Sequence, residues 1–193
     1  MNWNANDSSN YWNNGTPYNI AWDDWWDWWC ASFNGSNSKI NIPSLTAENN
    51  FTMSFWMKTT QSSRWEIVIL WDSSSKTFEV RNYTSKLQLE IWNNWWWSWN
   101  TIYSTSTINT WNWIHVCITK EWTSFKIYIM WIQEASMTSS KLMTWTNNRI
   151  WLHSNWSSDP YNWFIDNFII EKIVRNSDEA LKYVNKTKSK YWY

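Results

Sequence analysis

The sequence is short of the residues that usually build turns and crosslinks. It contains two glycines and three prolines in 193 residues, whereas average usage would give about 13 glycines. Its two cysteines, Cys30 and Cys117, are too few for a disulfide framework and have no metal-binding spacing. Two buried free thiols are the favoured interpretation, but the sequence leaves pairing open.

The chain also lacks a net charge of either sign. Sixteen Lys and Arg balance sixteen Asp and Glu, so nothing predicts a nucleic-acid partner. No apolar run approaches the roughly 18 residues that a membrane span needs. Residues 1–10, MNWNANDSSN, lack the features of a signal peptide. Either export is not encoded in this stretch, or the chain is one piece of a longer product.

Short apolar runs, separated by segments rich in Ser, Thr, Asn and Asp, predict a mostly β protein. Leu87, Leu89 and Ile91, for example, alternate with polar residues. Many short strands of this kind favour an all-β antiparallel sandwich or jelly roll. The predicted strands are residues 39–42, 51–58, 66–70, 78–83, 86–91, 113–120, 125–130, 149–153 and 164–171.

One helix is predicted near the end of the chain. Asn176 is a good N-cap, and Glu179 three residues later completes a capping box. The length suits a single domain spanning residues 1–193. The two histidines, His115 and His153, close no metal or catalytic pattern, so we expect structural or surface roles for them.

Tryptophan is abundant, with 24 copies. Most of them lie between the predicted strands, as in residues 93–100, NNWWWSWN. A tryptophan in a positive-φ turn is strained and exposes a large apolar face, whereas glycine would suit such a position. Trp56 and Trp113 alone lie inside predicted strands with an apolar rhythm around them.

Several segments carry family motifs when glycine is substituted at the turn tryptophans. They are WWCASFNGSNSKINIP (28–43), FTMSFWMK (51–58), WNWIHVCITKEW (111–122), FKIYIMWI (125–132) and WFIDNFIIE (163–171). In this order they resemble the laminin-G-like jelly-roll domains of the concanavalin A-like lectin/glucanase superfamily, over nearly the whole chain. The resemblance implies a two-sheet antiparallel jelly roll with one short C-terminal helix. It also allows for a missing first strand, because the chain starts almost at the DSSNYWNNGT opening (7–16); a sheet edge would then be exposed.

This resemblance leads to a hypothesis about the tryptophans. About 22 of the 24 would be glycines in the organism, encoded by UGA codons that some bacteria read as glycine. The alternative is a chain that is truly rich in tryptophan, such as a sticky carbohydrate binder.

Catalytic motifs are lacking. Glucanases of the superfamily use paired carboxylates, and the nearest pair is Asp166 with Glu171, five residues apart. An odd spacing in a strand predicts that they lie on opposite faces. We therefore expect a protein that is not an enzyme, and the resemblance implies a structural role for Asp166.

The resemblance implies a carbohydrate-binding or adhesion module of a bacterial surface or secreted protein. Its partner would be a glycan or a cell-surface protein, met outside the cell or at its surface. A structural spacer domain and, less favoured, a glycoside hydrolase are the alternatives. The candidate ligand contacts are Tyr103, His153, Asp159, Tyr161 and Asn162. Some family members bind calcium, so Asp7 and Asp166 are positions to examine, although two carboxylates do not make a site.

Overall fold

The computed structural model describes residues 5–8, 13–24, 29–45, 48–62, 64–71, 77–92, 99–140, 147–151 and 163–187. These residues form strands and one helix, α1 (Ser177–Thr187). The strands are β1 (Thr16–Tyr18), β2 (Ala21–Asp24), β3 (Trp29–Phe33), β4 (Lys39–Ile42), β5 (Asn50–Lys58), β6 (Trp65–Trp71), β7 (Thr77–Tyr83), β8 (Lys86–Trp92), β9 (Trp99–Thr107), β10 (Ile114–Glu121), β11 (Ser124–Ile129), β12 (Ile132–Thr138), β13 (Asn147–Trp151) and β14 (Trp163–Glu171).

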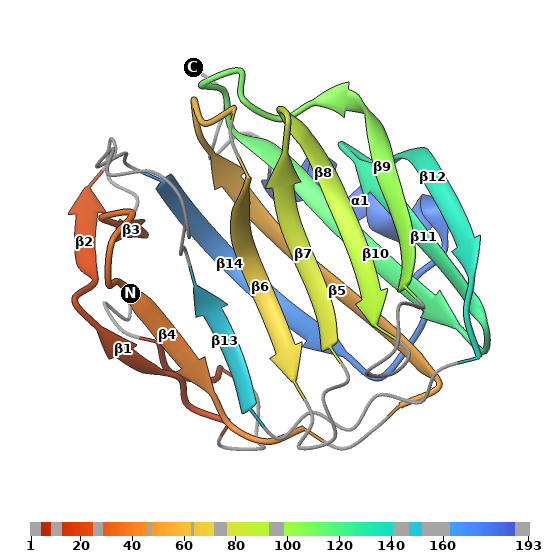
Figure 1. Ribbon diagram of the computed structural model, residues 1–193, viewed down its shortest axis with the longest axis horizontal. Helices are drawn as coiled ribbons and strands as arrows, with labels where there is room; N and C mark the ends of the chain where they lie inside the picture. The colour runs from red at the N-terminus through yellow and green to blue at the C-terminus, as the bar shows by residue number, and fades with distance from the viewer. Residues whose placement is uncertain are drawn as a thin grey trace.

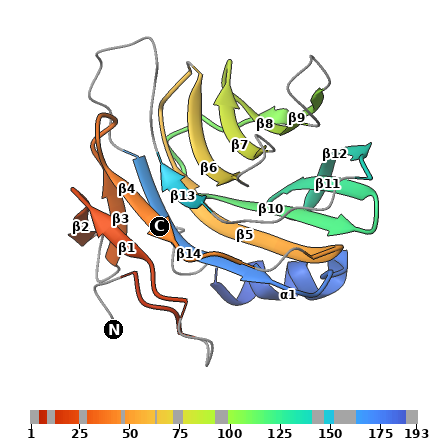
Figure 2. The same ribbon diagram turned by 60° about the horizontal axis from the view of Figure 1, so that its bottom comes forward.

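The strands make two seven-stranded sheets packed face to face (Figure 1). Sheet A has the order β1-β4-β13-β6-β7-β8-β9, and sheet B has the order β12-β11-β10-β5-β14-β3-β2. The strand pairs are antiparallel. Figure 2 shows sheet B lying between sheet A and α1. The predicted fold class, an all-β antiparallel jelly-roll sandwich with one short C-terminal helix, is confirmed.

The core lies between the two sheets and is built from alternate residues of their strands. Phe51, Phe55 and Met57 of β5 are completely buried, as are Leu87 and the other inward residues of β8. Phe51 and Phe78 meet edge to face across the core, with ring centroids 5.8 Å apart. The alternation of residues 86–91 therefore predicted correctly which side chains turn inward.

The helix α1 covers the outer face of sheet B. Its capping box is formed as expected, because Asn176 Oδ1 accepts hydrogen bonds from the backbone nitrogens of Asp178 (3.0 Å) and Glu179 (2.9 Å). Glu179 Oε2 accepts in return from the Asn176 backbone nitrogen. Beneath the helix, Val184 packs on an aromatic cluster that includes Trp56. No helix of the described residues is long and apolar enough to cross a membrane.

Several turns have a left-handed backbone at residues other than glycine. Three of these residues are tryptophans: Trp111 (φ 58°), Trp122 (φ 53°) and Trp131 (φ 68°). Gly35 also has a positive φ, of 68°. Gly15 is required for a different reason, since a Cβ there would lie 2.8 Å from the Ile40 side chain.

The tryptophans are not confined to turns. Trp65 begins β6 and Trp163 begins β14, and both are buried in the core together with strand residues. Trp56 lies inside β5 and is completely buried, whereas Trp113 precedes β10 and is half-buried. The prediction that Trp56 and Trp113 alone lie inside strands is therefore wrong, because tryptophans at strand ends can turn inward.

Cys30 of β3 and Cys117 of β10 are both buried thiols, as the favoured interpretation expected. Burial raises the pKa of the Cys117 thiol well above its ordinary value.

Side-chain hydrogen bonds join the two sheets along one side: Asn100 Nδ2 of β9 donates to the Thr138 carbonyl oxygen of β12 (3.2 Å), and one carboxylate accepts several more. Glu134 of β12, at the edge of sheet B, accepts hydrogen bonds from Thr105 and Ser106 of β9, at the edge of sheet A. Both backbone nitrogens and both hydroxyls of that pair donate to it. Burial raises the pKa of Glu134, but these hydrogen bonds outweigh burial and leave the pKa below its ordinary value.

Candidate functional site

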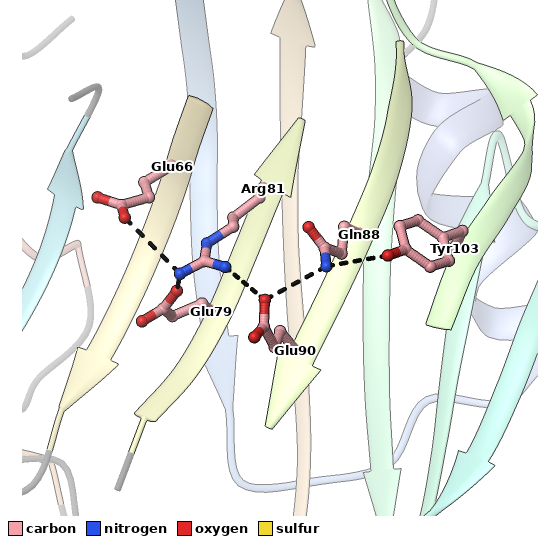
Figure 3. Close-up of polar contacts among 6 residues, drawn as sticks. All are labelled: Glu66, Glu79, Arg81, Gln88, Glu90 and Tyr103. Carbon is pink, nitrogen blue, oxygen red and sulfur yellow. Dashed lines mark hydrogen bonds and ion pairs between the residues drawn. The ribbon is translucent and has the colours of Figure 1, made fainter. Parts of the chain in front are cut away.

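The outward face of sheet A carries a polar cluster across β6, β7 and β8. Inward and outward positions alternate along each strand, so Phe78 and Val80 enter the core while Glu79 and Arg81 face outward. The register then places Glu79 opposite Glu90, and Arg81 opposite Gln88. We call Glu66, Glu79, Arg81, Gln88 and Glu90 the Arg81 cluster (Figure 3).

Arg81 stands at the centre of this cluster. Its guanidinium contacts the carboxylates of Glu79 and Glu90, and Glu66 lies 3.7 Å from Nη2. The Arg81 side chain is 4% exposed. Burial lowers the pKa of Arg81, and the carboxylates partly offset that effect. An arginine nevertheless keeps its charge in proteins, so the cluster is a buried ionic network.

Two exposed tyrosines border the Arg81 cluster. Tyr103 of β9 is 44% exposed and Tyr83 of β7 is 38% exposed, with their ring centroids 5.9 Å apart. Gln88 Nε2 donates to the Tyr103 hydroxyl (3.3 Å) and also to Glu90. Burial, together with Tyr83 and Glu90, raises the pKa of Tyr103. Open aromatic rings beside fixed polar groups are an arrangement that binds sugars.

Two polar atoms of the cluster have unused bonding capacity. Gln88 Oε1 and Arg81 Nε are buried and have no hydrogen-bond partner among the described residues. Native proteins pair nearly all such atoms. Both atoms are shielded from solvent, so a ligand on this face would contact the exposed tyrosines rather than these two atoms.

Of the ligand contacts predicted from the sequence, Tyr103 lies in this region. The other four predicted contacts fall outside the described residues, so their role stays a prediction: His153, Asp159, Tyr161 and Asn162. Sequence reasoning missed the Arg81 cluster itself. The sequence does contain polar residues at alternate positions of two strands, at 79 and 81 and at 88 and 90. Only the pairing register of β7 and β8 shows that these side chains meet on one face.

The two possible calcium positions are engaged in local hydrogen bonds. Asp7 Oδ2 accepts from the Asn13 backbone nitrogen (2.9 Å), and Asp166 Oδ1 accepts from that of Asn167 (2.7 Å). In the part of the chain that the structure describes, no three or more His, Cys, Asp or Glu side chains are grouped to hold a metal ion.

Asp166 and Glu171 lie on the same face of β14, contrary to the prediction. A register shift between Asp166 and Ile169 adds one residue, so Asp166 pairs with Trp56 and Glu171 with Thr52, both outward positions of β5. Asn167 has a φ of 48° in this bulge. The pair is still not catalytic, because four residues of β5 separate the partners by about 13 Å, more than the separations of about 5–9.5 Å in glycosidases.

Comparison with known proteins gives a family and several solved folds. The model of the "Concanavalin A-like lectin/glucanases superfamily" matches residues 34–180. The binding domain of Paraclostridial Mosquitocidal Protein 1 superposes with a TM-score of 0.83 at 16% identity, covering 96% of this chain and 50% of that one. No curated protein matches the chain.

Botulinum neurotoxin domains have the same fold. The receptor binding domain of botulinum neurotoxin D matches with a TM-score of 0.79 at 14% identity, covering 94% of this chain and 50% of that one. A structure of botulinum neurotoxin type C, whose cell entry depends on interaction with two ganglioside molecules, matches with a TM-score of 0.78 at 15% identity, covering 94% of this chain and 48% of that one. The chain thus spans about half the length of these structures.

Proposed function

The chain belongs to the concanavalin A-like lectin/glucanases superfamily, and we propose on that basis that it is a non-catalytic carbohydrate-binding or adhesion module of a bacterial surface or secreted protein. Its partner would be a glycan or a cell-surface protein. The similar fold of a receptor binding domain, that of botulinum neurotoxin D, supports a binding role. This chain covers about half of the botulinum neurotoxin D domain. The similarity therefore supports a shared fold and does not extend to the ligands of that domain.

The binding site that we propose is the outward face of sheet A around Tyr83 and Tyr103. The observation that carries it is the position of these two exposed rings, 5.9 Å apart, beside the buried polar groups of the Arg81 cluster. A sugar ring would stack on the tyrosines, and the Tyr103 hydroxyl, which accepts from Gln88, would donate its own proton to a sugar oxygen. His153, Asp159, Tyr161 and Asn162 are proposed as further contacts from the sequence.

A hydrolase is disfavoured by the same geometry. Glu79 and Glu90 are neighbouring carboxylates on an outward sheet face, as a glycosidase requires, but both are ion-paired to Arg81. A retaining or inverting mechanism needs one carboxylic acid that donates a proton. Two carboxylates that share one guanidinium do not supply it.

The test is a glycan-binding measurement on the intact chain, first on an array and then by calorimetry. Tyr103→Ala should weaken binding about fivefold or more, because stacking of a sugar on an aromatic ring contributes about 1–3 kcal/mol by analogy with base stacking. Tyr18→Ala is the matched control, since Tyr18 is 45% exposed on β1 at the far edge of the same sheet. Equal losses in both variants would reject the site.

A structural spacer domain is the second candidate. It predicts that no glycan binds at micromolar strength and that neither tyrosine variant changes any property except stability. A glycoside hydrolase is the third candidate. Glycan hydrolysis by the intact chain that disappears in Glu90→Gln would establish it.

We further propose that most tryptophans of the chain are glycines in the organism, read from UGA codons. The left-handed backbone at Trp111 and Trp122 supports this, because such a conformation costs about 1–2 kcal/mol for a residue with a Cβ and little for glycine. The side chains of both residues are also exposed, at 39% and 65%. Trp131 has the same left-handed backbone but supports the proposal less, because its ring stacks on His115 with the ring centroids 5.0 Å apart.

Peptide mass spectrometry on protein from its native source, covering residues 86–120, decides between the two readings. Glycine at Trp111 and at the tryptophans of residues 92–99 would establish the recoding. Tryptophan at these positions would mean that the indoles are real, and exposed ones such as Trp122 would become candidates for the binding surface.

A further inference from the structure

The strand β9 has a bulge directly after Tyr103, and a carboxylate from the other sheet holds that bulge. We propose that Glu134 is a positioning residue of the binding site, because it fixes the bulge and so keeps the Tyr103 ring beside Tyr83 before a glycan binds. This inference rests on the proposed carbohydrate-binding function. Three features of the chain support it: the register of β9, the hydrogen bonds within the bulge, and the hydrogen bonds that Glu134 accepts.

The pairing of β8 with β9 changes next to Tyr103. Gln88 pairs with Tyr103, but Lys86 pairs with Thr107. Between these two pairs β8 has one residue and β9 has three, residues 104–106, so β9 holds two more residues than a regular ladder would. A bulge bends its strand and can re-aim a side chain. Its conformation therefore sets the direction of the Tyr103 ring.

Neighbouring groups of sheet A hold part of the bulge. The Ser104 hydroxyl accepts a hydrogen bond from the Leu87 backbone nitrogen (2.9 Å) and donates one to the Ser106 carbonyl oxygen (2.7 Å). The Lys86 ammonium donates to the Thr105 carbonyl oxygen. These bonds use the carbonyl oxygens of the bulge, whereas its N–H groups at Thr105 and Ser106 are bound from sheet B.

Glu134 is the acceptor for those N–H groups. It belongs to β12, the edge strand of sheet B that lies beside β9 (Figure 1). Its Oε2 accepts from the backbone nitrogens of Thr105 (2.9 Å) and Ser106 (2.8 Å) and from the Thr105 hydroxyl. Its Oε1 accepts from the Ser106 hydroxyl (2.8 Å). Because β9 is itself an edge strand, these bonds do the work that a further paired strand would do.

The bulge adjoins the ring on which the sugar would stack. Tyr103 is 44% exposed, and its ring centroid lies 5.9 Å from that of Tyr83. An exposed side chain loses rotamer freedom when a ligand immobilises it, and this loss weakens binding. A backbone that is already fixed beneath the ring reduces that loss.

Glu134→Ala tests the inference with two measurements. Calorimetry with the glycan that binds the intact chain most strongly on an array should show binding weakened about two- to tenfold. In the free chain, nuclear Overhauser effects between the Tyr83 and Tyr103 rings should be lost. Glu134→Gln should restore most of both, because the amide oxygen can replace Oε2 while the amide nitrogen donates to the Ser106 hydroxyl.

Asn100→Ala is the matched control. Asn100 also links β9 to β12, since its Nδ2 donates to the Thr138 carbonyl oxygen (3.2 Å), but it lies outside the bulge. The control should leave the affinity and the ring contact unchanged. If Glu134→Ala does not fold, Ser106→Ala removes one hydroxyl donor from the bulge and should change both measurements in the same direction.

The outcomes separate this inference from the proposed function. An unchanged affinity or a persisting ring contact in folded Glu134→Ala would overturn the inference, and so would an equal loss in Asn100→Ala. Carbohydrate binding would still stand in each case if Tyr103→Ala weakens it. If the intact chain binds no glycan, both the inference and the proposed function fail.

Discussion

Below pH 6.5, the chain should lose stability because of one buried histidine. His115 is completely buried under α1, and neither ring nitrogen has a hydrogen-bond partner among the described residues. Aromatic rings surround it: Trp131 is stacked at 5.0 Å, Trp56 lies edge-on at 5.1 Å and Tyr183 of the helix lies at 5.6 Å. Burial lowers the pKa of His115 from 6.5 to about 3.

The size of the effect follows from proton linkage. Below pH 6.5 the unfolded chain binds a proton at His115, while the folded chain does not until about pH 3, so stability falls as the pH falls between these values. Each pH unit contributes about 1.36 kcal/mol. The loss is therefore about 2 kcal/mol at pH 5 and approaches about 5 kcal/mol near pH 3.

The groups around His115 do not supply a compensating carboxylate. Cys117 and Tyr128 share its buried cluster, and Tyr183 faces it from the helix. Asp166 is on the same face but one strand farther, beyond Trp56. Glu171 acts electrostatically on Cys117 and Tyr183 but is ion-paired to Arg175, and burial is the cause of the lowered pKa of His115. Protonated His115 would therefore be a buried, unpaired charge.

The assay is urea unfolding of the chain as written and of His115→Phe at pH 7.5 and pH 5. Phenylalanine keeps an aromatic ring in the stack and does not titrate. Other groups contribute equally to both proteins, so the wild-type loss between the two pH values should exceed that of the variant by about 2 kcal/mol. The same pH dependence in both proteins would refute the reasoning.

Three further predictions concern stability and can be measured by the same unfolding assay. Trp122→Gly should raise stability by about 1 kcal/mol, because it relieves a left-handed backbone and removes an exposed ring; a net loss would mean that the indole is needed. Arg81→Met should cost about 3–5 kcal/mol, because it leaves buried carboxylates without a counter-charge, and a neutral effect would show that water already solvates them. Asn176→Ala should cost about 1 kcal/mol by removing the α1 cap, whereas an unchanged midpoint would show that the helix is held by packing alone.

The sequence predicted the strands that alternate clearly. The run 39–42 coincides with β4, and the run 86–91 lies within β8. The strands β9 and β12 were missed, because their outward residues are mostly Ser, Thr and Gln and resemble loop sequence. β1 was missed because a three-residue, fully exposed edge strand has no apolar side to reveal it.

Tyr103 is the residue of the candidate site that the sequence suggested. The other residues of the site meet only through the pairing of neighbouring strands, which the sequence of a single strand does not reveal. The Arg81 cluster exists because two registers align, one between β6 and β7 and one between β7 and β8. The faces of Asp166 and Glu171 were assigned wrongly for a similar reason. A single bulge residue, Asn167, reverses the alternation, and its sequence gives little warning of it.

The Glu134 contact fastens the two sheets together on the side where β9 and β12 lie. On the opposite side β1 belongs to sheet A and β2 to sheet B, and the chain passes from one to the other through residues 19 and 20. The two layers are therefore tied by side-chain hydrogen bonds on one side and by the covalent chain on the other. Amide hydrogens should exchange first in β1, whose residues are all exposed, and this exchange should not require the sheets to separate.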